Sequence, residues 1–273
     1  MIILTADDYA MTYGVSRAIE QLARAGRLSA TSAMVTMPGW REDALRVREL
    51  RGQLAIGLHL NLTLGTPAGP MPALAPAGTL PKLKPLIARA LARRLTADEI
   101  GGEIRRQLDL FERALGFQPD HIDGHQHVQV LPTVRRALLD EVQRRYSASP
   151  PLLRDPSAPG TGKARIVNVL STGFRRAAKR RGLPTNDGFA GFSAFDVARD
   201  YADELHAAFA VKGHRAIVMC HPGFPDDTLA TLDEVVARRR QEYDALMTDA
   251  TLAQRIWRPE RAAHGAPIAW PLL

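Results

Sequence analysis

Short apolar runs alternate with amphipathic segments along this chain of 273 residues. The first run, residues 1–6, has no polar alternation, as expected of a parallel strand that is covered on both faces. In the segment that follows, residues 14–25, apolar side chains lie on one stripe, as in an amphipathic helix. Further strands are predicted at 29–37, 53–60, 120–129, 152–154 and 215–220, and further helices at 42–50, 82–95, 97–115, 132–146, 165–181, 197–211 and 229–247.

This alternation of strands and helices predicts an α/β fold built as a parallel barrel. No linker-like stretch divides residues 1–273, so we expect a single domain. Residues 65–81 contain too many prolines and glycines for regular structure, and we expect this long loop to form a rim or lid of a site. The sequence Thr-Ala-Asp-Glu at 96–99 predicts a capping box at the start of helix 97–115.

The charge of the chain narrows the list of partners. The formal net charge is +7, and arginine supplies 31 of the 36 basic residues. These arginines are spread along the sequence without interleaved aromatic residues, so we expect no nucleic-acid partner. Cys220 is the only cysteine, and no apolar run approaches the roughly 18 residues that span a bilayer. The chain begins directly on an apolar strand, and we expect a cytoplasmic protein.

Ionisable residues follow several of the predicted strands. Asp7 and Asp8 come after the first strand, His59 ends the third, and His221 follows the last. The segment 120–129 is the richest, because alternation would place His121, Asp123, His125, His127 and Gln129 on one face. Arg154 follows a further short strand. A parallel barrel has its active site at this end of its strands.

One carboxylate and two imidazoles can bind a divalent metal and leave positions open for water and substrate. The metal would lower the pKa of that water and polarise a carbonyl. A second carboxylate would then be available as a general base, and a distant histidine could return a proton to a leaving amine. These groups suit a metal-assisted amide hydrolase. The alternative readings are a surface loop with solvated histidines and, for His59 alone, a satisfied core residue.

The chain closely resembles the ChbG/HpnK (YdjC-like) carbohydrate deacetylase family over nearly its full length. The resemblance lies in four ordered motifs, Ala-Asp-Asp-Tyr at 6–9, Gly-Leu-His-Leu-Asn-Leu at 57–62, His-Ile-Asp-Gly-His-Gln-His at 121–127 and Cys-His-Pro-Gly at 220–223. It implies a distorted TIM-like α/β barrel related to polysaccharide deacetylases, which removes the N-acetyl group of an acetylated amino sugar with a divalent metal.

The resemblance also implies roles for individual residues. Asp8, His59 and His125 match the metal ligands, Asp7 matches the base, and His221 matches a candidate proton donor. Arg154 matches an arginine that could keep the base ionised. We assign substrate binding to His127, Asn61 and Asp123, in the same motifs. Zn²⁺ is the expected metal, with Mg²⁺ or another divalent ion as alternatives.

Some assignments stay open at this stage. Gln129 stands where family members often carry a further histidine, which leaves the third ligand open between His125 and His127. The competing functions are a metal-dependent phosphoesterase and a non-catalytic sugar-binding relative. The basic helix 82–95 would allow peripheral membrane contact if the substrate is lipid-linked, and a homodimer is compatible with the sequence.

Overall fold

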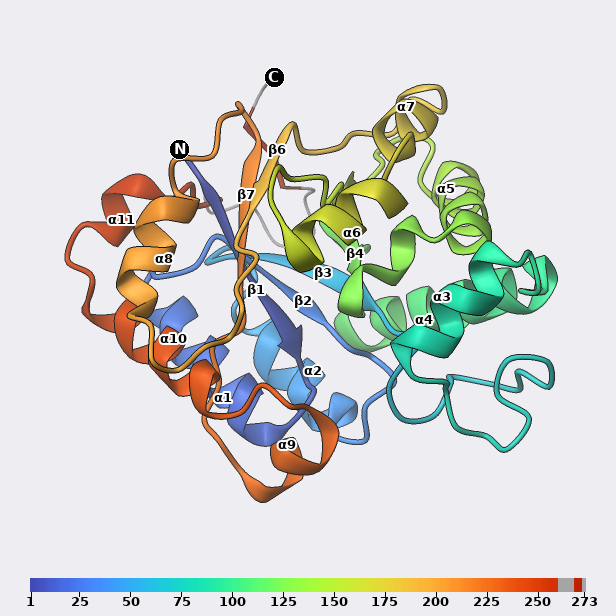
Figure 1. The fold of residues 1–273 in the computed structure, drawn as a ribbon, viewed down its shortest axis with the longest axis horizontal. Coiled ribbons are helices and arrows are strands. Elements are labelled where there is room, and N and C mark those ends of the chain that lie inside the picture. Colours follow the sequence, from blue (N-terminus) through green and yellow to red (C-terminus); the bar gives the residue numbers. More distant parts are fainter. Residues whose placement is uncertain (260–267, 272–273) are drawn as a thin grey trace. The chain divides into compact units, whose positions relative to one another are not determined.

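Strand β1 (Ile3–Tyr9) is buried at every position and has parallel neighbours on both sides. In this computed structural model, which describes residues 1–259 and 268–271, Thr5 of β1 pairs with Ala30 of β2 (Ala30–Ala33) and with Met219 of β7 (Ala216–Cys220). β6 (Gly188–Ala190) pairs with the other edge of β7 (Figure 1). The pairing of β1 with β2 is irregular between Ala6 and Tyr9, where a bulge shifts the register.

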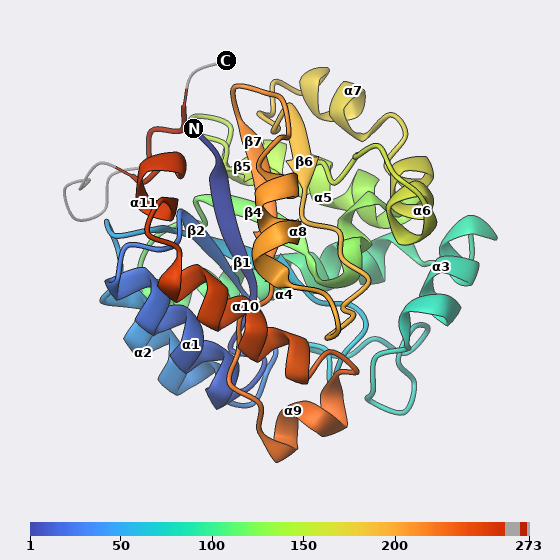
Figure 2. The same cartoon turned by 60° about the vertical axis from the view of Figure 1, so that its left-hand side comes forward.

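The chain divides into two compact units. The first unit contains residues 1–33, 39–57 and 186–273, and its first helix packs against β1. Helices α1 and α10 run alongside each other in both ribbon views (Figures 1 and 2). The helices of this unit are α1 (Tyr13–Arg24), α2 (Trp40–Arg48), α8 (Tyr201–Ala208), α9 (Asp227–Leu232), α10 (Ala237–Thr248) and α11 (Leu252–Arg255).

The second unit contains residues 34–38 and 58–185. Strand β3 (Ala55–Leu60) ends in this unit, where it pairs in parallel with β4 (His121–Gly124), and β4 pairs in parallel with β5 (Leu152–Leu153). A 3₁₀ segment, η1 (His125–Val130), follows β4 directly. The helices of this unit are α3 (Leu83–Leu91), α4 (Ala97–Leu115), α5 (Pro132–Arg145), α6 (Gly162–Leu170) and α7 (Phe174–Lys179).

The strands follow one another in the order β5-β4-β3-β2-β1-β7-β6. The strand pairs are parallel, and helices separate successive strands in the chain. These features confirm the predicted α/β fold of the distorted TIM-like type. The expectation of a single domain stays a prediction.

Three predicted elements are wrong in detail. The predicted helix 165–181 is two helices, because Gly173 adopts a left-handed φ of 81° between α6 and α7. The predicted helix 229–247 is also divided, since Asp233 is extended after α9 and α10 begins at Ala237. The predicted capping box does not form, because the Thr96 side chain makes no cap hydrogen bond.

The carboxylate that the capping box would have used, Glu99, holds the long loop instead. It accepts hydrogen bonds from the backbone N–H groups of Ala73 and Leu74, at 2.8 and 3.0 Å. Glu103, one turn further along α4, accepts from the backbone N–H of Ala68 at 2.7 Å. Residues 65–81 have no helix or strand, as predicted, but this loop is fastened to α4 at several points. Its role as a rim or lid stays a prediction.

Candidate functional site

The end of β1 places two buried carboxylates next to each other in the chain. Asp7 and Asp8 are each 2% exposed. Asp8 has a φ of 67°, a left-handed conformation that is uncommon outside glycine and is tolerated best by Asn and Asp. Together with the bulge between Ala6 and Tyr9, this conformation breaks the regular alternation of the strand. The two carboxylates therefore have different neighbours, His221 for Asp7 and Arg239 for Asp8.

Asp7 faces the histidine that follows β7. Its Oδ2 lies 4.0 Å from Nε2 of His221. The backbone N–H of His221 donates to Oε2 of Glu242 on α10 at 2.5 Å, and the Phe195 ring meets the His221 ring edge-on at 5.4 Å. Burial raises the pKa of Glu242, with the charge of His221 acting against it. The first unit thus brings together a carboxylate and an imidazole, two side chains that can transfer protons.

Asp8 has a different partner. Its Oδ2 accepts from Nη2 of Arg239, on α10, at 2.7 Å. Arg239 was not singled out from the sequence, where it lies inside the basic run Arg238-Arg239-Arg240 of a predicted helix. Such a run usually marks a solvated face, whereas Arg239 is 1% exposed.

In the second unit, His59 at the end of β3 pairs with Asp123 on the neighbouring strand. The two residues are in register, and His59 Nδ1 lies 2.6 Å from Asp123 Oδ1. The carboxylate accepts the Nδ1 proton, so the lone pair of His59 is on Nε2, where it can bind a metal. A carboxylate behind a histidine in this way is the usual second partner of a metal-binding imidazole.

Arg154 completes this group from the far side of Asp123. Its Nη2 forms an ion pair with Asp123 Oδ2 at 2.5 Å, and His121 Nε2 lies 3.8 Å from the same oxygen. Burial alone would raise the pKa of the Asp123 carboxyl, but Arg154 and His59 outweigh burial and hold it well below its usual range. Asp123 is therefore ionised at neutral pH and fixes the orientation of His59.

The predicted alternation of side chains along 121–129 is wrong after Gly124. The chain turns into η1, where Gln126 and His127 have φ values of 54° and 60°. It folds back so tightly that a Cβ on Gly124 would lie 2.7 Å from Oε1 of Gln129. Gln129 Nε2 donates to the Arg154 carbonyl at 3.3 Å. At the position where family members often carry a further histidine, this chain therefore has a residue that supports the turn.

This turn brings His125 beside His59. Their ring centroids lie 5.6 Å apart with an interplanar angle of 67°. Both side chains are buried. Two neighbouring imidazoles, one of them oriented by a carboxylate, fit two positions in the coordination shell of a divalent cation.

Asn61 is used by its own loop. Its Oδ1 accepts from the backbone N–H groups of Thr63 and Leu64, and its Nδ2 donates to Thr36 and to the Leu64 carbonyl. These contacts, and those of Asp123, give both residues a structural role. Their assignment to substrate binding, like that of His127, stays a prediction.

Comparison with known proteins gives the family. The sequence model of the YdjC-like protein family matches residues 1–255. The chain belongs to the YdjC-like family. This finding confirms the resemblance that was read from the four motifs.

Two proteins of similar sequence are named chitooligosaccharide deacetylase. The chain is 29% identical to the chitooligosaccharide deacetylase of Proteus mirabilis strain HI4320, over 94% of this chain and 93% of that one. It is 32% identical to the chitooligosaccharide deacetylase of Serratia marcescens, over 84% of each chain.

A solved structure from Enterococcus faecalis V583, of a protein named for cellobiose-phosphate cleavage, shares the fold with a TM-score of 0.74. That structure is 22% identical and covers 95% of this chain and 97% of its own. No helix among residues 1–259 and 268–271 is long and apolar enough to cross a membrane.

Proposed function

We propose that this YdjC-like protein is a metal-dependent deacetylase that removes the acetyl group from the nitrogen of an acetylated amino sugar. The observation that carries the proposal is the buried His59–Asp123 pair, which leaves Nε2 of His59 as a ligand atom. The named relatives support the substrate class, because they are chitooligosaccharide deacetylases.

The proposed metal ligands are Asp8, His59 and His125. All three are buried, and the rings of His59 and His125 lie close together in the second unit. An Asp-His-His set accepts Zn²⁺ readily and also tolerates harder ions such as Mg²⁺. When bound, such an ion polarises the amide carbonyl of the substrate and makes water more acidic.

The proton transfers are assigned to Asp7 and His221. Asp7 takes a proton from the attacking water, and His221 returns one to the nitrogen of the leaving amino sugar. The proximity of the two side chains, with Asp7 Oδ2 at 4.0 Å from His221 Nε2, supports a role for both in one reaction. Arg154 forms an ion pair with Asp123 and so supports His59, and its role in keeping the base ionised remains a prediction. His127, Asn61 and Asp123 remain the predicted substrate contacts, and the cytoplasmic location and the homodimer remain predictions.

The two carboxylates provide the test. Asn keeps the shape of Asp while removing its charge, so Asp7→Asn should retain bound metal and lose about 10²- to 10⁴-fold in the rate of acetate release. Asp8→Asn should instead lose metal and recover part of its activity when metal is added in excess. The assay measures metal content and acetate release from acetylated chito-oligosaccharides for both variants.

Opposite behaviour of the two variants would reverse the roles, and full activity in both would refute the deacetylase assignment. Phosphate release from phosphoesters by the same samples would favour the phosphoesterase. Binding of the sugar without acetate release in the presence of metal would favour a non-catalytic relative.

A further inference from the structure

Arg239, in the first turn of α10, is among the largest fully buried side chains of the described chain. A buried guanidinium is expensive unless its charge is compensated. Burial alone would lower the pKa of Arg239, but the carboxylates of Asp8 and Asp233 outweigh burial and raise it. Arg239 therefore carries its charge into the interior of the first unit, next to the end of β1.

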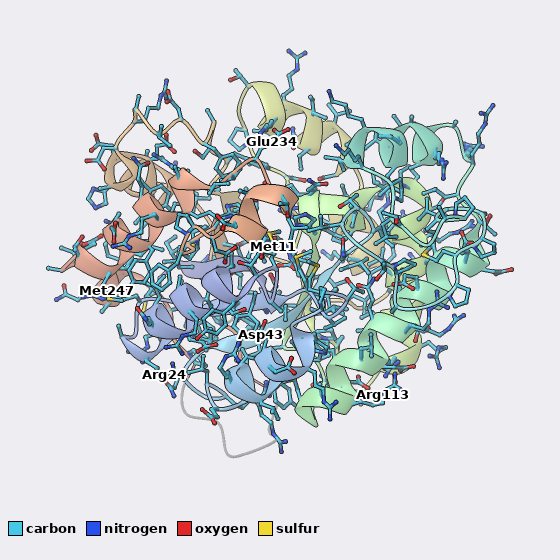
Figure 3. All side chains as sticks on the ribbon, turned by 90° about the horizontal axis from the view of Figure 1, so that it is seen from below. Met11, Arg24, Asp43, Arg113, Glu234 and Met247 are labelled. Carbon is cyan, nitrogen blue, oxygen red and sulfur yellow. The ribbon has the colours of Figure 1, made fainter. Side chains whose placement is uncertain are left out.

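One nitrogen of Arg239 serves both carboxylates. Nη2 donates to Oδ2 of Asp8 at 2.7 Å and to Oδ2 of Asp233 at 2.6 Å. Met11, labelled in Figure 3, lies beside this group, with its Sδ 3.8 Å from Nη2. Nη2 has two protons, so each carboxylate receives one of them. Because the other proton is bound by Asp233, the position of the N–H group that Asp8 accepts from is fixed.

The rest of Arg239 and its second acid are also held in place. Nε donates to the Val235 carbonyl at 3.0 Å, and the backbone carbonyl of Arg239 accepts from the N–H of Gly223 at 3.0 Å. Asp233 uses its other oxygen, Oδ1, to accept from the backbone N–H of Val235 at 3.1 Å. The guanidinium that meets Asp8 is therefore anchored by groups that do not themselves belong to the site.

Arg238, the preceding residue of α10, is a buried arginine with structural contacts. Arg238 is also 1% exposed, and it pairs with Glu204 at 2.8 Å, donates to the carbonyls of Asp196 and Arg199, and lies over the Tyr201 ring. None of these partners is a candidate site residue. Arg239 differs because its charge is directed to Asp8, whose backbone is already in the left-handed region.

We propose that Arg239 is a positioning residue for the metal-binding carboxylate of Asp8, with Asp233 as its anchor. The arginine holds Oδ2 of Asp8 and so fixes the direction in which this carboxylate would face a bound cation. The hydrogen bond from this fixed guanidinium restricts the Asp8 side chain before a cation binds, so less conformational entropy would be lost on binding. This inference rests on the proposed function, because it requires Asp8 to be a ligand.

The experiment measures metal affinity by competition with a chromogenic chelator, so that activity is not the only readout. Arg239→Met should weaken metal binding by about 10- to 100-fold, the usual effect of removing a partner that orients a ligand. Arg239→Lys keeps the charge but not the planar geometry, and should also bind metal more weakly than the wild type. Asp233→Asn should shift the affinity in the same direction, because it weakens the anchor of Arg239.

Arg238→Met is the matched control, because it removes an equally buried arginine one residue away. It should lower the melting temperature and leave the metal affinity within about threefold of wild type, well short of the change expected from losing such a partner. Wild-type affinity in folded Arg239→Met would overturn the proposal, and if that variant does not fold, wild-type affinity in Arg239→Lys and Asp233→Asn overturns it equally. A wild-type protein that binds no metal would refute the proposed function itself.

Discussion

Replacing Asp123 by Asn tests whether the second unit contains a charge cluster that orients His59. Asp123 is fully buried, and its carboxylate forms an ion pair with Arg154 at 2.5 Å. Asn fills the same space and can still accept from His59 Nδ1, but it leaves the buried guanidinium without that charge. Breaking a buried pair in this way costs about 3–5 kcal/mol, out of a total stability of about 5–15 kcal/mol.

This loss is large enough to measure by urea unfolding in the presence of a chelator, which removes any contribution from metal. With a slope of about 3 kcal/mol per molar, the midpoint should fall by about 1–2 M. Asp140→Asn is the control, because the same substitution there breaks an exposed pair with Arg181 and should cost at most about 1 kcal/mol. Equal midpoints for the two variants would refute the interpretation of Asp123 as the centre of a buried charge cluster.

The pH dependence of this difference has a definite sign. The folded-state pKa of Asp123 lies below its unfolded value of about 3.9, so ionised Asp123 stabilises the fold above that pH. As the pH falls from about 4 towards the folded-state pKa, the unfolded chain takes up a proton and this stabilisation is lost. The gap between wild type and Asp123→Asn should therefore stay constant from pH 7 to 5 and narrow below pH 4. A gap that already closes between pH 7 and 5 would contradict the lowered pKa.

Three further predictions address other contacts. Tyr9→Phe removes the hydroxyl that donates to the Asp43 carbonyl at 2.8 Å and to Glu20 at 3.1 Å, and should lower the free energy of unfolding by about 1–3 kcal/mol in denaturant titrations; an unchanged midpoint would show that these bonds add nothing. Glu99→Ala should release the loop 65–81 and speed its cleavage in limited proteolysis, whereas Glu42→Ala, on α2, should not. If the basic residues of 82–94 meet anionic lipid, the protein should float with phosphatidylserine vesicles at low salt and lose this binding when Lys82, Lys84, Arg89, Arg93 and Arg94 become Gln; no flotation of the wild type would refute the membrane contact.

The sequence predicted the parts of the fold that depend on local pattern. Apolar runs located β1, β3 and β7, and polar residues at their ends pointed to Asp7, Asp8, His59 and His221. Hydrophobic period alone could not locate the turn after Gly124, because it depends on the close approach of Gln129 to that glycine. A strand pattern with alternating histidines looks the same whether or not the chain folds back.

The residues that support the site were the hardest to predict. Arg239 and Glu242 lie in a charged helix segment whose composition is typical of a solvated surface, yet both are buried. Their position depends on which side of α10 faces the strands, and that side carries charged residues instead of an apolar stripe. Sequence patterns identify residues by type and spacing, whereas a buried ion pair is fixed by two segments that lie far apart in the chain.

The central place of β1 has a consequence for how the protein is made. Thr5 and Cys220 meet across the β1–β7 pair although 215 positions separate them in the chain. At a synthesis rate of about 5–20 residues per second, β1 leaves the ribosome roughly 10–40 s before β7. During that interval, one edge of β1, which is buried at every position in the folded protein, has no native neighbour, and an unpaired strand edge can pair with other chains. We expect the nascent protein to depend on chaperones, and the yield of folded protein to improve when it is expressed at low temperature.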